Sequence, residues 1–299
     1  MEGIRFLMAS SLPRRAWDKT AVLLELVKFS HTLFALPFAL AGALLAGQPW
    51  PSFSQFFWIL LAMVGARTGA MGFNRLVDER LDANNPRTKM RPLSSGRIGR
   101  REVIVLVVAS FALLAYSAYR LNPLCFALSP LAIAWVCFYS YTKRFSWISH
   151  FVLGFSLALA PIGAWLAVRG SFNATPLVIG LAVLLWVAGF DILYALQDME
   201  FDREQGLFSV PALLGIKRSL TISRLLHVTT VLLLLSIVGQ EGMDWLYGMG
   251  IAGGASLLIV EHRLISADDL SRLNTAFFTT NSFFSIIFLL AVIVGKLGP

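Results

Sequence analysis

The chain of 299 residues is 57% hydrophobic and only 14% charged, with a mean hydropathy of +0.71. Soluble domains carry roughly 25% charged residues, so this composition excludes an ordinary soluble fold and indicates that a lipid bilayer surrounds the protein. The formal net charge of +8 is expected to mark loops on the cytoplasmic side of that membrane, and not a surface that binds nucleic acid.

Nine apolar runs in the sequence are each near the length of about 20 residues that crosses a bilayer as a helix. They predict an all-α integral membrane protein with nine transmembrane helices. In chain order, the runs lie near residues 24–46, 54–77, 102–119, 123–141, 148–168, 176–197, 219–238, 245–261 and 273–295.

The connections between these runs differ in their content of lysine and arginine. The connection between the second and third runs carries seven basic residues, and the other even-numbered connections carry two or three, whereas the odd-numbered ones carry none or one. Basic residues are retained on the cytoplasmic side. We therefore expect a protein of a bacterial-type inner membrane, with its N-terminus inside, its C-terminus outside and its active site facing the cytoplasm.

Two polar stripes end the second and sixth runs. In the first, "NRLVDERLD", Asn74, Asp78 and Asp82 are four residues apart and lie on one helix face, drifting by about 40° per step. The second is "DILYALQDMEFD" at residues 191–202. In a continuous α-helix its polar residues lie within about 60° of one face. They are Asp191, Tyr194, Asp198 and Asp202.

The two stripes are related by a constant shift in the sequence. A step of 120 residues carries Asn74 to Tyr194, Asp78 to Asp198 and Asp82 to Asp202. We therefore predict a single domain over residues 1–299, built from a duplicated four-helix unit at about residues 20–141 and 145–263 plus a ninth helix. Such a repeat would place the two stripes opposite each other across a central cavity.

The chemistry of the stripes favours a metal-assisted phosphate site. A single aspartate at the end of a membrane helix is often only solvated, but two spaced and duplicated sets indicate function. Oxygen ligands without histidine or cysteine suit Mg²⁺, which is usually held by a few carboxylates together with substrate phosphates. Facing aspartates that share Mg²⁺ would hold a diphosphate between them.

Both stripes resemble the N-x-x-x-D-x-x-x-D and D-x-x-Y-x-x-x-D-x-x-x-D motifs of the UbiA superfamily of membrane aromatic prenyltransferases. The resemblance extends to the nine runs, to the places of the motifs on the second and sixth, and to "NPRTKMRPLSSGRI" after the first motif. It implies a Mg²⁺-dependent enzyme that moves a polyprenyl chain from polyprenyl diphosphate to an aromatic hydroxy acid. Diphosphate is released, and the pathway is ubiquinone or menaquinone biosynthesis.

The resemblance also implies roles around the diphosphate. Four aspartates would hold Mg²⁺ and an asparagine would orient them, while two basic residues in "YSYTKRFSW" would grip the diphosphate. Three basic loop residues would cap the site, although positive charge on the cytoplasmic side is an alternative reason for them. The four aspartates are Asp78, Asp82, Asp198 and Asp202, and the asparagine is Asn74. The residues that would grip the diphosphate are Lys143 and Arg144, and the loop residues are Arg87, Lys89 and Arg91.

Other residues are implied at the acceptor. Asp191, one turn before Tyr194, matches a position that activates or deprotonates the acceptor. Arg67 lies two turns deeper than Asn74 and matches an arginine that binds the acceptor's carboxylate in 4-hydroxybenzoate enzymes; the alternative is a structural ion pair with Asp191. The ring of Tyr139 is a candidate for stabilising the allylic cation, the alternative being ordinary packing.

The first apolar run does not decide which aromatic acid is the acceptor. Its "KFSHTLFALPFALAG" resembles members of the futalosine menaquinone route, whose acceptor is a dihydroxynaphthoate, more than typical 4-hydroxybenzoate enzymes. His31 is expected at the acceptor end, or else as an interior histidine with its hydrogen bonds satisfied. Haem O synthases and chlorophyll synthases share the aspartates. A secondary transporter is the alternative from another class, and its charges should lie near the membrane midplane.

Overall fold

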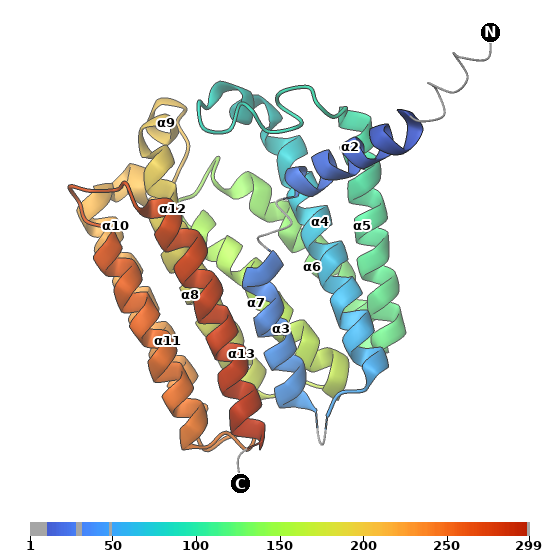
Figure 1. Ribbon diagram of the computed structural model, residues 1–299, viewed down its shortest axis with the longest axis vertical. Coiled ribbons are helices and arrows are strands. Elements are labelled where there is room, and N and C mark those ends of the chain that lie inside the picture. The colour runs from blue at the N-terminus through green and yellow to red at the C-terminus, as the bar shows by residue number, and fades with distance from the viewer. Residues whose placement is uncertain (1–10, 28–31, 48–49, 298–299) are drawn as a thin grey trace.

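The structure is a computed structural model that describes residues 11–27, 32–47 and 50–297, and the regular elements in these ranges are all helical (Figure 1). The helices stand roughly side by side, and α2 lies across one end of them. They are α2 (Ser11–Leu26), α3 (Thr32–Ala46), α4 (Phe53–Asn84), α5 (Arg100–Leu121), α6 (Pro123–Thr142), α7 (Ser149–Arg169), α8 (Ala174–Ala195), η2 (Leu196–Asp198), α9 (Met199–Glu204), α10 (Val210–Leu235), α11 (Trp245–Leu264), α12 (Leu273–Thr275), η3 (Ala276–Thr280) and α13 (Asn281–Leu297).

The first apolar run, predicted as one span over residues 24–46, is divided in the described residues between α2, which ends at Leu26, and α3, which begins at Thr32. Two ion pairs tie α2 to the rest of the protein: Lys19 Nζ lies 2.9 Å from Glu102 Oε1, and Arg97 Nη2 lies 2.6 Å from Glu25 Oε1. α3 has 15 residues.

Seven helices in the described ranges are long and apolar enough to cross a membrane. This finding confirms an all-helical integral membrane architecture. α3 is shorter, and α11 is not among the seven, because its last turns carry charged and polar groups. Nine transmembrane helices and the 120-residue duplication therefore stay predictions. The seven are residues 53–84, 100–121, 123–142, 149–169, 174–204, 210–235 and 273–297.

Close helix packing builds the two sides of the bundle. α4 packs along α5, and α8 packs between α7 and α10, while α3 contacts α7 and α13. At Gly65 a side chain would come within 2.6 Å of the Ser110 carbonyl oxygen, and at Gly154 within 2.3 Å of that of Leu184. Small residues at these crossings let the backbones approach. Large aromatic side chains, such as Trp165 and Trp186, fill the core between α3, α7, α8, α11 and α13.

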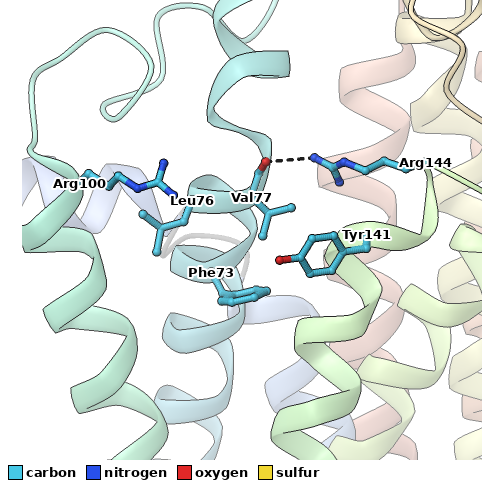
Figure 2. A pocket seen from close by; sticks show the side chains of 6 residues that line it. All are labelled: Phe73, Leu76, Val77, Arg100, Tyr141 and Arg144. Carbon is cyan, nitrogen blue, oxygen red and sulfur yellow. Dashed lines mark hydrogen bonds between the residues drawn. The ribbon is translucent and has the colours of Figure 1, made fainter.

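A cavity of about 380 Å³ lies between α4, α5 and α6 (Figure 2). Apolar side chains of α4 form one wall, and the guanidinium of Arg144 reaches across it to the Val77 carbonyl. This cavity is not the central one predicted between the two polar stripes, which stays a prediction. Its lining residues are Phe73, Leu76, Val77, Arg100, Tyr141 and Arg144.

Candidate active site

α4 carries the first polar stripe near its C-terminal end. Asn74 Nδ2 donates a hydrogen bond to Asp78 Oδ2 over 3.0 Å, so residues one turn apart contact each other. Asp78 is 2% exposed and Asp82 is 5% exposed. Buried carboxylates require hydrogen-bond donors or opposite charges, and cations from two other segments supply them.

The partners of Asp78 follow the end of α6. Lys143 Nζ lies 3.0 Å from Asp78 Oδ2, and Arg144 Nη2 lies 2.7 Å from Asp78 Oδ1. Arg144 also donates to the carbonyl oxygens of Ser140, over 2.6 Å, and Val77, over 3.0 Å. The guanidinium is thereby fixed between α6 and α4. The two residues predicted to grip the diphosphate are thus both at the first stripe.

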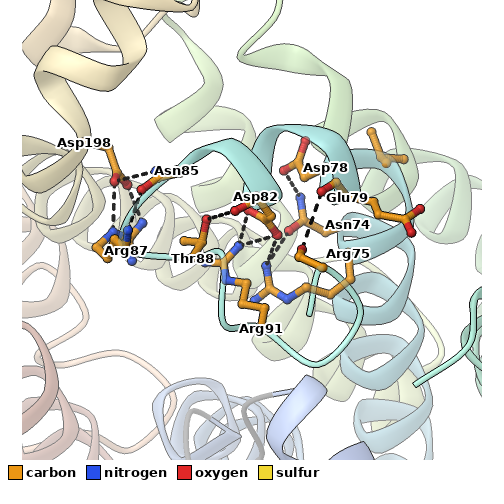
Figure 3. Close-up of polar contacts among 12 residues, drawn as sticks. Asn74, Arg75, Asp78, Glu79, Asp82, Asn85, Arg87, Thr88, Arg91 and Asp198 are labelled. Carbon is orange, nitrogen blue, oxygen red and sulfur yellow. Dashed lines mark hydrogen bonds and ion pairs between the residues drawn. The ribbon is translucent and has the colours of Figure 1, made fainter. Parts of the chain in front are cut away.

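The partner of Asp82 comes from the loop between α4 and α5. Arg91 Nη1 donates to both carboxylate oxygens of Asp82, over 2.7 and 2.8 Å. Arg75 Nη1 lies 3.8 Å from Asp82 Oδ2 and donates to Asn74 Oδ1 over 3.2 Å (Figure 3). Arg75 is only 6% exposed, and it is not among the site residues predicted from the sequence. Arg75 is a charged residue inside a membrane helix, and this signal, which also indicated Arg67, could have identified it.

The second stripe lies on a helix that changes type. α8 ends at Ala195, the 3₁₀ turn η2 covers Leu196–Asp198, and α9 begins at Met199. A 3₁₀ turn advances by about 120° per residue, and an α-helix by about 100°. The second stripe therefore spans three helical segments and not one continuous α-helix, and the common face predicted over residues 191–202 stays a prediction.

The loop that follows α4 connects the two stripes. Asp198 Oδ1 accepts hydrogen bonds from Asn85 Nδ2 over 3.0 Å and from Arg87 Nε over 2.9 Å, and Arg87 Nη2 forms an ion pair with Asp198 Oδ2 (Figure 3). Arg87 Nη1 also donates to the Tyr194 hydroxyl over 2.9 Å. Burial lowers the pKa of Arg87, but the hydrogen bond to Asp198 and its charge outweigh burial and raise this pKa above its usual value.

Lys143 lies between the stripes. Besides its ion pair with Asp78, its charge acts on both Asp198 and Asp202. Phe208 N donates to the Lys143 carbonyl oxygen over 2.7 Å, which holds the segment after α9 against the end of α6. Lys89 is exposed, and within the described part of the chain its ammonium forms no ion pair with a carboxylate.

A second layer is defined by the two residues that precede the aspartates by two to three turns along α8 and α4, Asp191 and Arg67. Asp191 Oδ2 lies 2.7 Å from His150 Nδ1, and His150 is 3% exposed. His150 is not among the site residues predicted from the sequence, because one histidine at the start of an apolar run carries no signal. Tyr139 lies on α6, one turn before Lys143, the partner of Asp78.

Arg67 has no partner in this layer. Its Nε is buried and has no hydrogen-bond partner among the described residues. Asp191 is hydrogen-bonded to His150, and no ion pair between Arg67 and Asp191 occurs in the described ranges, so the structural pairing considered above is not found. His31 lies outside the described residues.

The arrangement of carboxylates fits one mode of metal binding. Over residues 11–27, 32–47 and 50–297, no three His, Cys, Asp or Glu side chains gather so as to hold a metal ion by themselves. Mg²⁺ is usually bound through one or two carboxylates, with waters and substrate phosphates completing its shell. The aspartates of the two stripes offer that donor set to a phosphate-bound ion.

Comparison with known proteins agrees with this site. Residues 35–287 match the UbiA prenyltransferase family. The chain is 29% identical over 281 residues to a 4-hydroxybenzoate octaprenyltransferase of Sodalis glossinidius, covering 94% of this chain and 97% of the relative. It is 32% identical over 243 residues to a 4-hydroxybenzoate octaprenyltransferase of Aeromonas salmonicida, covering 78% of this chain and 81% of that relative.

Solved structures show the same fold. The apo structure of a UbiA homolog from Aeropyrum pernix K1 has a TM-score of 0.80 and 35% identity, covering 88% of this chain and 97% of that chain. A UbiA homolog from Archaeoglobus fulgidus bound to DMAPP and Mg²⁺ has a TM-score of 0.72 and 22% identity, covering 93% and 99% of the two chains. This chain therefore belongs to the UbiA prenyltransferase family and is an integral membrane prenyltransferase.

Proposed function

We propose that this enzyme transfers a polyprenyl chain from polyprenyl diphosphate to an aromatic hydroxy acid, with Mg²⁺ required and diphosphate released. The observation that carries the proposal is the pair of layers in the site. One layer gathers carboxylates and cations from both stripes, and the deeper layer holds a hydrogen-bonded carboxylate, Asp191, and Arg67, whose buried Nε has no hydrogen-bond partner among the described residues. The first suits a metal diphosphate and the second suits an aromatic acid.

In this proposal the diphosphate binds between the stripes. Asp78, Asp82, Asp198 and Asp202 are the residues that would hold Mg²⁺, with Asn74 orienting Asp78 through its hydrogen bond. When bound, Mg²⁺ neutralises the charge of the diphosphate and so assists its departure.

The basic residues that now pair with the carboxylates would then bind diphosphate oxygens. An Arg or Lys that leaves an aspartate for a phosphate exchanges one charge-assisted hydrogen bond for another. Lys143 and Arg144 approach from α6, whereas Arg87 and Arg91 approach from the loop after α4. Lys89, on the same loop, is exposed and would reach the diphosphate only after this loop moves.

The acceptor would bind in the deeper layer. The planar fork of Arg67 matches a carboxylate in two parallel hydrogen bonds, and its unpaired Nε supports a ligand as the missing partner. Asp191 would take the proton that the acceptor loses. Tyr194, hydrogen-bonded by Arg87, and Tyr139 would present their rings to the allylic cation.

Two acceptors are supported by separate observations. The relatives named as 4-hydroxybenzoate octaprenyltransferases support 4-hydroxybenzoate and a ubiquinone pathway. The sequence "KFSHTLFALPFALAG" supports a dihydroxynaphthoate and a menaquinone pathway, with His31 at the acceptor end. Both acceptors carry the carboxylate that Arg67 would bind.

The active site is proposed to face the cytoplasm of a bacterial-type inner membrane. The basic loop between α4 and α5 lies at the site end of the bundle, and α2 lies at that end too, whereas α13 finishes at the opposite end (Figure 1). With basic loops inside, this gives an N-terminus inside and a C-terminus outside. A reporter fused after Pro299 should read as periplasmic; a cytoplasmic reading would overturn the orientation.

One assay tests the function. Purified protein in nanodiscs is given Mg²⁺, a polyprenyl diphosphate and, in separate reactions, 4-hydroxybenzoate, a dihydroxynaphthoate and a phenol without a carboxylate. We expect diphosphate release and a prenylated product with one of the two acids and little with the phenol. Absence of diphosphate release would favour a transporter. In a further reaction that offers haem or a chlorophyll precursor in place of the acids, transfer to that acceptor alone would favour another prenyltransferase of the family.

A further inference from the structure

His150 occupies a fixed position beside the proposed acceptor layer. It is the second residue of α7, and its side chain is almost completely buried. Both ring nitrogens have partners: Nδ1 lies 2.7 Å from Asp191 Oδ2, and the backbone nitrogen of Val210 lies 3.2 Å from Nε2. The ring therefore bridges α8 and the first residue of α10.

These partners determine where the histidine proton lies. A backbone N–H can only donate, so Nε2 of His150 must accept the hydrogen bond from Val210 and carries no proton. The imidazole is then neutral with its proton on Nδ1, since a neutral ring has one N–H. That N–H points at Asp191, which accepts the hydrogen bond through Oδ2.

The other oxygen of Asp191 is available to a ligand. Within the described residues Oδ1 forms no hydrogen bond, and the Asp191 side chain is 21% exposed, whereas that of His150 is 4% exposed. A carboxylate fixed through one oxygen presents the other in a set direction. Such fixing by a neighbouring hydrogen bond is how outer residues orient functional groups.

The bridge also reaches the diphosphate side of the site. Val210 follows Ser209, whose side chain accepts a hydrogen bond from Ala212 N and caps α10. Two residues earlier than Val210, Phe208 N donates to the carbonyl of Lys143. One short segment thus contacts both the support of Asp191 and the backbone of a cation at the first stripe.

We propose that His150 is a positioning residue that holds Asp191 in the orientation needed to take the acceptor's proton. The inference rests on the proposed function, in which Asp191 is the base. His150 does not touch substrate; it acts as a neutral donor, and the N–H of Val210 selects the tautomer that makes it one. Replacing the donor should therefore slow turnover without weakening binding of the prenyl diphosphate.

Two substitutions separate the two ring nitrogens. In His150→Asn the amide nitrogen can take the place of Nδ1, because both are bonded to Cγ, so the donor to Asp191 is kept and the contact with Val210 is lost. In His150→Gln the amide is one carbon farther out, near the place of Nε2, so the reach to Val210 is kept and the donor to Asp191 is lost. Both variants remove the ring and so serve as controls for each other.

The expected result is a split between the variants in kcat. For His150→Gln we expect kcat to fall about 10- to 100-fold, the effect of losing a hydrogen bond to a charged group, with the KM for prenyl diphosphate changed by less than about threefold. For His150→Asn we expect kcat to stay within about fivefold of the native enzyme. Equal loss in both variants, or a loss confined to the diphosphate KM, would overturn the proposal.

A double-mutant cycle separates positioning from general support of the fold. Residual turnover is measured for Asp191→Asn and for Asp191→Asn combined with His150→Gln. If His150 acts through Asp191, the second change should cost less than about twofold once the carboxylate is gone. If Asp191→Asn lowers turnover and His150→Gln lowers it further by the same factor as in the native enzyme, the positioning role of His150 is overturned and the proposed function is not. No transfer by the native enzyme, or full activity of Asp191→Asn, would instead mark failure of the proposed function.

Discussion

The two polar stripes share their spacing but not their backbone. Asn74, Asp78 and Asp82 lie on α4, one helix of 32 residues, and they keep the common face that a four-residue spacing gives. The equivalent residues after Asp191 pass from α8 through the 3₁₀ turn η2 into α9. Equal spacing in the two stripes is therefore carried by different backbones, and Asp198, at the end of the 3₁₀ turn, contacts Asn85 and Arg87 of the loop after α4.

The stripes also differ in how their charges are compensated. The side chain of Asp78 is 3% exposed and is held by two cations from the end of α6, whereas that of Asp198 is 18% exposed and is held by Arg87 of the loop. The first stripe is part of the packed bundle. The same loop supplies a cation to each stripe, Arg91 to Asp82 and Arg87 to Asp198, but only Asp78 is also held by cations from the end of a helix in the bundle.

Removal of metal should affect both stripes at once and give the largest effect. We expect EDTA to abolish prenyl transfer and added Mg²⁺ to restore it, because diphosphate cannot leave with its charge uncompensated. The measurement is diphosphate release against free Mg²⁺ concentration. Turnover that persists in EDTA would contradict a shared metal site between the stripes.

Removal of one carboxylate from either stripe tests whether both are needed. Asp78→Ala and Asp198→Ala should each lower turnover by roughly 1,000-fold, the upper range for losing one electrostatic contact to the reacting group, while the protein still inserts into the membrane. Asp78→Ala should also lower the melting temperature more, because it leaves Lys143 and Arg144 without their carboxylate. Full activity in either variant would refute the two-stripe site. Equal melting temperatures of the two variants would contradict the proposal that Asp78 is more important for packing than Asp198.

Arg67 tests the deeper layer on the α4 side. Arg67→Ala should raise the acceptor's KM by about 30- to several-thousand-fold, which corresponds to roughly 2–5 kcal/mol for a charged pair in a low-dielectric pocket. The KM for prenyl diphosphate should barely change, and Arg67→Lys should recover little, because a point charge does not replace a planar fork. Steady-state kinetics with each substrate varied separately give the answer. A rise in the diphosphate KM would instead assign Arg67 to the phosphate layer.

Sequence patterns predicted the elements that depend on local signals. The run predicted over residues 102–119 is α5 at Arg100–Leu121, and the next one, predicted over 123–141, is α6 at Pro123–Thr142. The short boundary between them is real, because Asn122 caps α6 by accepting a hydrogen bond from Cys125 N over 2.9 Å. Hydrophobic length and a capping residue are local properties, and the sequence shows them directly.

The 3₁₀ turn in the second stripe and the partners of the buried carboxylates depend on contacts between distant segments. The change to a 3₁₀ turn at Leu196–Asp198 occurs without glycine or proline nearby in "YALQDME", so no local signal marks it. Asn85 and His150 became visible only through Asp198 and Asp191, which are 113 and 41 residues away in the sequence. The partner of a buried carboxylate is set by tertiary packing, and spacing within one helix does not reveal it.

The smallest expected effect concerns the loop that joins the stripes. Arg87→Gln removes the ion pair with Asp198 and the hydrogen bond to Tyr194, so the KM for prenyl diphosphate should rise by roughly 10-fold, as for one charged hydrogen bond. Arg100→Gln is the matched control at the other end of the same loop. Arg100 pairs with Glu79 over 2.5 Å, but its side chain is 60% exposed, and exposed pairs contribute little. Its KM values should stay within about twofold. Equal effects of the two substitutions would mean that the loop acts only through its general positive charge. A large effect of Arg87→Gln alone, lost when Asp198 is also replaced by Asn, would locate the effect in the contact between the loop and the second stripe.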